Sequence, residues 1–325
     1  EALHAVASIY DPLGLINPVV VKFKIFFQKL CIDNIKWDEK ISAEHLKEWT
    51  TLVNDLGQVK FLETDRNYCY EDPSDPFVNI ELHGFSDAGK KAYGACIYLR
   101  FTKNSGIIST VLVTSKSRVC PIKQKSVPRL ELLACVVLSR LLKDVKQNLF
   151  TVIDIDELIC WTDSSASYAW IMNNNEKLPK FVRNRVKEIK KNLPVDVWRL
   201  VPSKLNPSDI ITKGCSPLGL LCDLWQHGPQ FLKLPRSEWP NLKIGSNFSD
   251  ACLHAVAEEV TDHVSDDETV SVTCLDKTVC LSEIICIENY SSLTKLLRIT
   301  ALVVLFATKL RQQVANNKNN RNKRH

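Results

Sequence analysis

The chain has 325 residues, of which 45% are hydrophobic, and its formal net charge at pH 7 is +5. This length and apolar content suffice for one large or two small domains with a sizeable core, so we expect a folded, soluble protein. The longest apolar run near the end, residues 299–307, is too short to span a bilayer, and we place no part of the chain in a membrane. The twelve cysteines form no Cys-x-x-Cys pair, which argues against a zinc site and against a small disulfide scaffold.

The first 70 residues have a helical pattern that breaks at residues 8–18, SIYDPLGLINP. Pro18 suits the first turn of a helix over residues 19–30, because its φ angle is fixed and its missing N–H would have no partner there. The chain starts at Glu1 with neither an initiator Met nor a signal-peptide pattern, so we expect it to be a piece of a longer polypeptide.

After residues 72–77, DPSDPF, which have the composition of a linker, the hydrophobic period changes. Apolar residues alternate over 78–82 and 93–99 with glycines around the connection, a pattern that predicts a hairpin of two strands. Residues 111–114 predict a third strand. Pro128 then opens a helix that runs to residue 149 with a 3.6-residue apolar period.

Residues 158–162 predict a fourth strand, followed by helices over 165–172 and 180–192, a fifth strand over 195–201 and a helix over 206–212 that Gly214 ends. The order βββαβααβα predicts an α/β domain over residues 75–215, in which helices flank a five-stranded mixed sheet. Beyond residue 215 we expect a helix over 218–224, a loop over 229–240, a helix over 293–313 and a disordered tail from Asn316.

Four acids stand at the strand ends and helix starts of this order: Asp87, Glu131, Asp163 and Asp209. Each has a purely structural explanation as a turn residue, a helix cap or a first-turn acid favoured by the helix dipole. If the strand ends bring them together, however, they would repel one another unless cations lay among them. Two Mg²⁺ ions about 4 Å apart use such a cluster to clamp a phosphodiester. Ser164 or Ser165 would then cap the helix that follows Asp163.

Seven stretches of the chain together resemble the polyprotein of BEL/Pao-type retrotransposons. They are SIYDPLGLINPV, WDEKI, FSDAGKKAYGACIY, TSKSRVCPIKQKSVPRLELLA, WTDSSASYAWI, FVRNRVKEI and VPSKLNPSDIITKGCSP. The resemblance covers residues 1–240. It implies a small helical closing segment of a reverse transcriptase at 1–72, a ribonuclease H-like domain at 75–215 and a linker toward a missing integrase at 216–325, partly disordered.

By this resemblance the activity would be cleavage of the RNA strand of RNA/DNA hybrids with two Mg²⁺ ions, for which Mn²⁺ could substitute. Asp87 would bridge both metals, Asp209 would share the metal that activates water, and Glu131 with Asp163 would hold the metal on the leaving-group side. Glu131 is also placed to sense the 2′-hydroxyl that distinguishes RNA. The partners would be the polymerase body and the integrase of the same polyprotein, in a cytoplasmic virus-like particle or in the nucleus.

Residues 177–191 contain seven lysines and arginines, and Lys204 lies in the loop before Asp209. The first group could be a solvated helix face, but so many cations with few acids favour contact with nucleic-acid phosphates. Many cellular and retroviral relatives carry a His in this loop, which helps the product leave, so Lys204 in its place implies slower or differently gated turnover. The candidate nucleic-acid-binding residues are Lys180, Arg183, Arg185, Lys187, Lys190 and Lys204.

Two other functions compete with the nuclease. The first is a non-catalytic nucleic-acid-binding or scaffold domain of a decayed or domesticated element. The presence of all four acids is evidence against such decay. The second is a DNA strand-transferase of the same superfamily, in which the helical Glu comes last, whereas Glu131 comes second here. The chain has no Tyr-x-Asp-Asp motif and would not polymerise alone.

Overall fold

A computed structural model describes residues 4, 8–36, 39–64, 67–68, 72–123, 125–149, 152–172 and 178–242. The helix expected over 293–313 and the tail from Asn316 lie outside these residues. Within the described part of the chain, no helix has the length and apolar character needed to cross a membrane.

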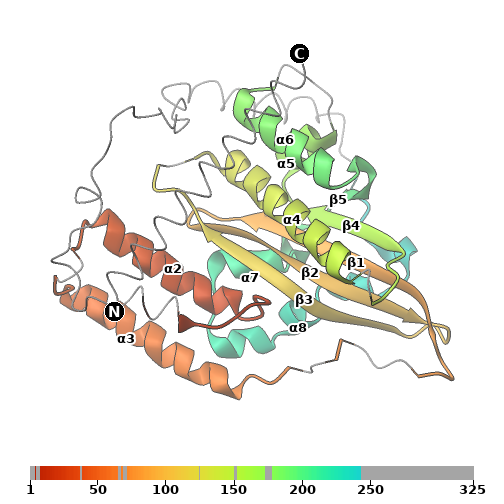
Figure 1. Ribbon diagram of the computed structural model, residues 1–325, viewed down its shortest axis with the longest axis horizontal. Coiled ribbons are helices and arrows are strands. Elements are labelled where there is room, and N and C mark those ends of the chain that lie inside the picture. The colour runs from red at the N-terminus through yellow and green to blue at the C-terminus, as the bar shows by residue number, and fades with distance from the viewer. Residues whose placement is uncertain are drawn as a thin grey trace, which may run out of the picture. The chain divides into compact units, whose positions relative to one another are not determined.

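The sheet has five strands in the spatial order β3-β2-β1-β4-β5 (Figure 1). Strands β1, β2 and β3 pair antiparallel, whereas β4 runs parallel to β1 and β5 runs parallel to β4, which confirms the predicted mixed sheet. Their bounds are β1 Phe77–Ala88, β2 Ala92–Lys103, β3 Ile108–Val119, β4 Glu157–Thr162 and β5 Trp198–Leu200. Because Ser86 is paired with Thr162, the carboxyl ends of β1 and β4 meet at the same edge.

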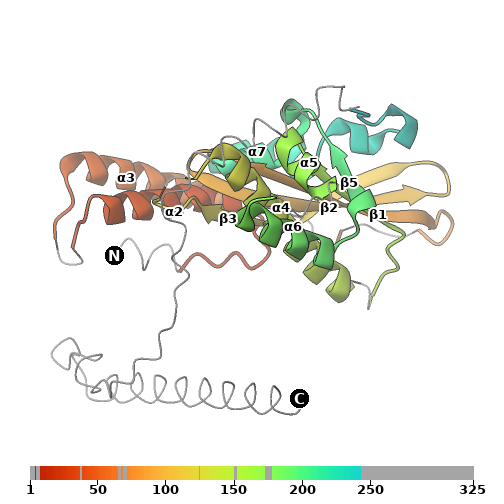
Figure 2. The same cartoon turned by 90° about the horizontal axis from the view of Figure 1, so that it is seen from above.

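The helices form a layer on each face of the sheet (Figure 2). One layer is α4 Val127–Leu149, α5 Ser165–Met172 and α6 Lys180–Asn192. The other face is covered by α2 Asn17–Ile32, α7 Ser208–Lys213 and α8 Asp223–Gln226, with α3 Ala43–Gly57 packed on α2. Short 3-10 turns lie at η1 Gln58–Phe61, η2 Val195–Val197, η3 Ser203–Leu205, η4 Pro217–Leu221, η5 Gln230–Lys233 and η6 Arg236–Glu238.

Alternation along β2 explains why two cores form. Ile97 and Leu99 pack toward α4, whereas Cys96 and Tyr98 belong to the core on the other face. Gly84 of β1 lets α4 approach closely, because a Cβ atom at this position would overlap the side chain of Leu138. The sheet is therefore buried on both faces, as strands with helices on each side require.

The break before α2 is a turn that docks on the edge of β3. The Asp11 carboxylate accepts hydrogen bonds from the backbone N–H groups of Leu15 and Ile16, at 2.9 and 3.1 Å. Asn17 then joins the turn to the sheet: its Nδ2 donates to Ser115 Oγ at 3.0 Å, and Ser117 Oγ donates to its Oδ1 at 2.9 Å. The N-terminal segment is thus fixed to the sheet by buried polar contacts.

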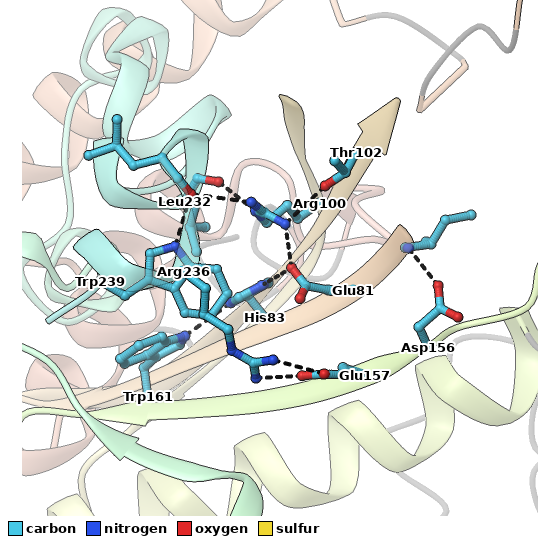
Figure 3. Close-up of polar contacts among 12 residues, drawn as sticks. Glu81, His83, Arg100, Thr102, Asp156, Glu157, Trp161, Leu232, Arg236 and Trp239 are labelled. Atoms are coloured by element: carbon cyan, nitrogen blue, oxygen red, sulfur yellow. Dashed lines mark hydrogen bonds and ion pairs between the residues drawn. The ribbon is translucent and has the colours of Figure 1, made fainter. Parts of the chain in front are cut away.

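Residues 230–239 lie against the face of the sheet opposite α4, beside β1 and β2 (Figure 3). Arg100 Nε donates to the Leu232 carbonyl at 2.7 Å, and Arg236 forms an ion pair with Glu157 at 2.5 Å. Phe231 and Leu232 are buried in the core of this face. The sequence predicts a loop here, and the structure differs in that η5 and η6 form within it. The backbone N–H groups of Leu232 and Glu238 close these turns by donating to the carbonyls of Pro229 and Pro235, each at 2.9 Å.

The boundaries of two predicted strands also differ. The fifth strand is expected over 195–201, but only Trp198–Leu200 pairs with β4, and η2 precedes it. The third strand is longer than the expected 111–114, because polar residues toward its end are buried against α2. The order of elements, βββαβααβα, is confirmed.

Candidate metal centre

Three acids from separate elements meet at the edge where β1 and β4 end. Asp87 lies near the end of β1, Asp163 directly follows β4, and Glu131 lies in the first turns of α4. Each can contribute a carboxylate oxygen to a group in which all three oxygens lie within 4.8 Å of one another. This convergence follows from the parallel pairing of β1 with β4 and from the packing of α4 on β1.

The surroundings oppose ionisation of two of these acids. Burial raises the pKa of Asp87 to about 6, with the charges of Asp163 and Asp209 adding to the effect and a hydrogen bond from Thr212 opposing it. Burial also raises the pKa of Glu131 to about 9, and the neighbouring Asp87 and Asp163 add to it. A cation placed among these acids would stabilise their ionised forms, since a nearby opposite charge lowers the pKa of a carboxyl group.

Glu131 supplies the observation against which a metal can be tested. Its Oε2 atom is buried, and among the described residues no polar atom is hydrogen-bonded to it. A buried carboxylate oxygen without a partner is costly, and such atoms are rare in folded proteins. Three carboxylates offer the hard oxygen ligands that Mg²⁺ prefers. The residues present therefore fit a divalent cation.

Asp163 is not needed as a helix cap. Ser164 Oγ accepts a hydrogen bond from the backbone N–H of Ser167 at 3.2 Å, so Ser164 caps α5, as one of the two predicted alternatives has it. The Asp163 carboxylate instead faces Asn206, whose Nδ2 donates to its Oδ1 at 3.3 Å. Asp163 is thus left available to the cluster of acids.

Two polar residues of the site were not expected from the sequence. Asn206 is buried, and its Nδ2 also donates to the Ser86 carbonyl of β1 at 2.9 Å. Thr212 is buried on α7 and donates to Asp87 Oδ2 at 2.5 Å. In the sequence both have the character of helix-end residues, and the only signal for them is their place within three residues of Asp209.

Asp209 lies outside the group of three. It stands in the first turn of α7, and its Oδ2 forms an ion pair with Lys213 Nζ at 2.6 Å on the surface of that helix. Its charge nevertheless raises the pKa of Asp87, because the two carboxylates are near each other. A role for Asp209 as a fourth ligand remains a prediction.

The basic helix α6 has the two faces that the sequence suggested. Val182, Val186 and Ile189 are buried toward α4. The outward face carries the exposed Lys180, Arg183 and Lys187, while Lys204 is exposed in η3, directly before the buried Asn206. The two remaining candidates are more enclosed: Arg185 stacks over Phe181 with its guanidinium carbon 3.8 Å from the ring centroid, and burial lowers the pKa of Lys190.

Comparison with known proteins adds a family and a set of similar structures. The family model described as "Pao retrotransposon-like RNaseH-like domain" matches residues 1–164, just over half of the 325 residues. No curated protein sequence matches the chain.

The chain is similar to LC11-RNase H1 in complex with an RNA/DNA hybrid, with 16% identity and a TM-score of 0.28, over 41% of this chain and 93% of the other. It is also similar to RNase H1 of the halophilic archaeon Halobacterium salinarum, with 12% identity and a TM-score of 0.26, over 40% and 90%. The foamy viral protease-reverse transcriptase in complex with an RNA/DNA hybrid has 11% identity and a TM-score of 0.23, over 57% and 27%.

Proposed function

The chain belongs to the family of Pao retrotransposon-like RNaseH-like domains, and from this premise we propose that it is a metal-dependent endonuclease that hydrolyses the RNA strand of RNA/DNA hybrids. The observation that carries the proposal is that one carboxylate oxygen from each of Asp87, Glu131 and Asp163 lies within 4.8 Å of the other two. We further propose Mg²⁺ as the metal, in a pair. The setting would be a retrotransposon polyprotein whose polymerase body and integrase are the partners.

The residues divide the work of holding the metal between them. Asp87, Glu131 and Asp163 would be direct ligands, and Glu131 would offer the oxygen that no described residue bonds. Asp209 would join them on leaving its ion pair with Lys213, which is exposed and therefore weak. When bound, the ions supply the positive charge that stabilises the attacking and leaving oxygens of a phosphodiester.

The rest of the site would position the acids and the substrate. The Asn206 amide donates both to Asp163 and to the Ser86 carbonyl of β1, so it would hold the ends of β1 and β4 at a fixed separation. The exposed cations of α6 and Lys204 would contact phosphates of the hybrid, because their side chains lie at the surface and phosphate contacts come mainly from lysines and arginines. Glu131 would distinguish the strands through the 2′-hydroxyl, which only RNA carries.

The test is cleavage of a hybrid with one labelled RNA strand, in Mg²⁺ and in EDTA, beside DNA and RNA duplexes of the same sequence. We expect cuts in the RNA of the hybrid with Mg²⁺ alone, and none in the DNA duplex. Asp163→Asn, which loses one of the proposed metal ligands, serves as the inactive control. A protein that binds the hybrid in Mg²⁺ but leaves its RNA intact would instead be the non-catalytic binding domain that competes with this proposal.

A further inference from the structure

Helix α7 places a buried hydroxyl against the cluster of acids. Thr212 Oγ1 donates to Asp87 Oδ2 at 2.5 Å, and both residues are buried. We propose that Thr212 is a positioning residue of the metal centre: its hydroxyl holds the Asp87 carboxylate in the orientation that brings it within reach of Glu131 and Asp163. This inference rests on the proposed function, because it assigns Thr212 a role toward the metal that these acids would hold.

The hydroxyl has two acceptors within reach and a single proton to donate. Thr212 Oγ1 lies 3.1 Å from the backbone carbonyl of Asp209, the contact that a threonine within a helix often makes. The carboxylate of Asp87 is closer, at 2.5 Å, and carries charge, so it is the stronger acceptor. The hydroxyl therefore donates its proton to Asp87, and the contact with the carbonyl does not explain why a threonine stands at position 212.

The support behind Thr212 is firm enough to fix a carboxylate. Helix α7 has six residues and cannot be stable by itself, so its place is set by its contacts. Ser208 Oγ donates to the Phe85 carbonyl of β1 at 2.8 Å, and just past α7 the Cys215 N–H donates to the Pro18 carbonyl of α2 at 3.1 Å. The helix is thus held from the sheet on one side and from α2 on the other.

Positioning, unlike a stabilising role alone, predicts a change in metal affinity. Groups that orient metal ligands typically alter affinity or activity by about 10- to 100-fold when removed. Because Thr212 is buried, its hydroxyl is not offered to nucleic acid at the surface, and its removal should leave the binding of nucleic acid unchanged. The signature is therefore a higher Mg²⁺ requirement with an unaltered KM for the hybrid.

The experiment compares Thr212→Val, which replaces the hydroxyl by a methyl group of similar size, with Thr212→Ser, which keeps it. Thermal unfolding of the whole chain is followed while Mg²⁺ is added, and the concentration that gives half of the rise in Tm is read for each protein. We expect this midpoint to rise on the order of 10-fold in Thr212→Val and to return close to wild type in Thr212→Ser. At saturating hybrid and fixed low Mg²⁺, kcat should fall in parallel.

The matched control is Thr114→Val on β3, which removes another buried threonine hydroxyl, one that donates to the Leu13 carbonyl at 2.7 Å. It should lower Tm without metal and leave the Mg²⁺ midpoint unchanged. If Thr212→Val does not fold, Thr212→Ala removes the same hydroxyl with less bulk.

The outcomes separate the inference from the nuclease proposal. Equal Mg²⁺ midpoints in Thr212→Val and wild type overturn the inference while leaving the nuclease intact. If the Tm of the wild type does not change when Mg²⁺ is added, both the inference and the metal centre are overturned. A wild type that binds Mg²⁺ but cuts no hybrid overturns the proposed activity, and a raised midpoint in Thr212→Val still supports Thr212 as a positioning residue.

Discussion

Trp161 donates its indole N–H to Nδ1 of His83 at 3.1 Å, which fixes His83 as a neutral imidazole with its proton on Nε2. An indole can only donate, so Nδ1 must accept. The Nε2 atom lies 3.3 Å from Glu81 Oε2 and donates to it, and burial lowers the pKa of His83. Arg100 Nη1 donates to the same carboxylate oxygen at 2.7 Å (Figure 3), so Glu81 has a buried partner of opposite charge.

The first prediction concerns the acid stability that Glu81 provides. Burial alone would raise its pKa, but the hydrogen bond from His83 and the charge of Arg100 hold the pKa at about 2, below the ordinary 4.5. Because the folded pKa is the lower one, this stability is present above pH 4.5 and is lost as the pH falls toward 2. Glu81→Gln should lower the free energy of unfolding at pH 7 by about 3 kcal/mol, since Arg100 is left buried without a counter-charge. Urea unfolding at pH 7 and at pH 3 measures both effects.

The matched control is Glu157→Gln, which breaks the exposed ion pair with Arg236. Its effect on the free energy of unfolding should be below about 1 kcal/mol, because solvent screens exposed pairs. Between pH 4.5 and 2 the Glu81→Gln protein should also show a flatter fall in stability than wild type. Equal effects in the two variants would mean that the buried cluster contributes no more than a surface pair.

The parts of the fold that sequence predicts are those governed by local periodicity. Ile97 and Leu99 alternate with residues of the opposite core, and that alternation is visible in the sequence. The far end of β3 was missed because Ser115 and Ser117 are polar and nevertheless buried. Their partner, Asn17, is about a hundred residues away, at a separation of 98 for Ser115, and no local pattern reveals it.

The candidate site shows the same division. Asp87, Glu131 and Asp163 could be selected because the predicted order of strands places them at one edge of the sheet, where several carboxylates would repel one another without a cation. The structure brings these three together. Asn206 was missed because an amide just before a helix is an ordinary capping residue. Thr212 was missed because a hydroxyl in the last turn of a short helix has no special pattern in the sequence. Only the packing of α7 on β1 turns them toward carboxylates.

A second prediction addresses the outward face of α6. Lys187 and Lys191 are both exposed, so reversing them to Glu should leave the fold intact. Binding of the RNA/DNA hybrid should weaken, and the slope of log affinity against log salt should become shallower by about one for each phosphate that the helix no longer binds. Fluorescence anisotropy at several salt concentrations measures this slope. Lys47→Glu, an exposed reversal on α3, is the control, and an identical slope in both proteins would identify α6 as a solvated face.

A third prediction concerns the turn before α2. Asn17→Ala removes two buried hydrogen bonds to Ser115 and Ser117, whose hydroxyls are then without that partner. We expect the free energy of unfolding to fall by about 2 kcal/mol, because buried polar groups left without a partner are costly. Chemical denaturation gives the value. Asn148→Ala, at an exposed position of α4, should change it by less than about 0.5 kcal/mol, and similar values for both would show that the turn is not held by Asn17.

A fourth prediction follows from the raised pKa values of the acid cluster. Without metal, the stability that Glu131 and Asp87 contribute is present below their ordinary pKa values and is lost as the pH rises through about 6 for Asp87 and about 9 for Glu131. In EDTA, Tm should therefore fall between pH 6 and pH 9, and Glu131→Gln should reduce that fall. Mg²⁺ should raise Tm most at the higher pH, because ligands must be deprotonated to bind it. An unchanged pH trend in Glu131→Gln would contradict this account.

The last prediction concerns Asp87, the most buried acid of the three. Asp87→Asn keeps the size of the side chain, and its amide oxygen can still accept from Thr212, so the fold should persist without the cost of a buried charge. One negative charge fewer weakens metal binding, and cleavage of the RNA strand should fall on the order of 100-fold or more. Affinity for the hybrid, measured by anisotropy, should stay near wild type, because phosphate contacts come from lysines and arginines. Asp144→Asn, exposed on α4, should change neither quantity, and cleavage by Asp87→Asn at the rate of this control would refute the assignment of the metal site.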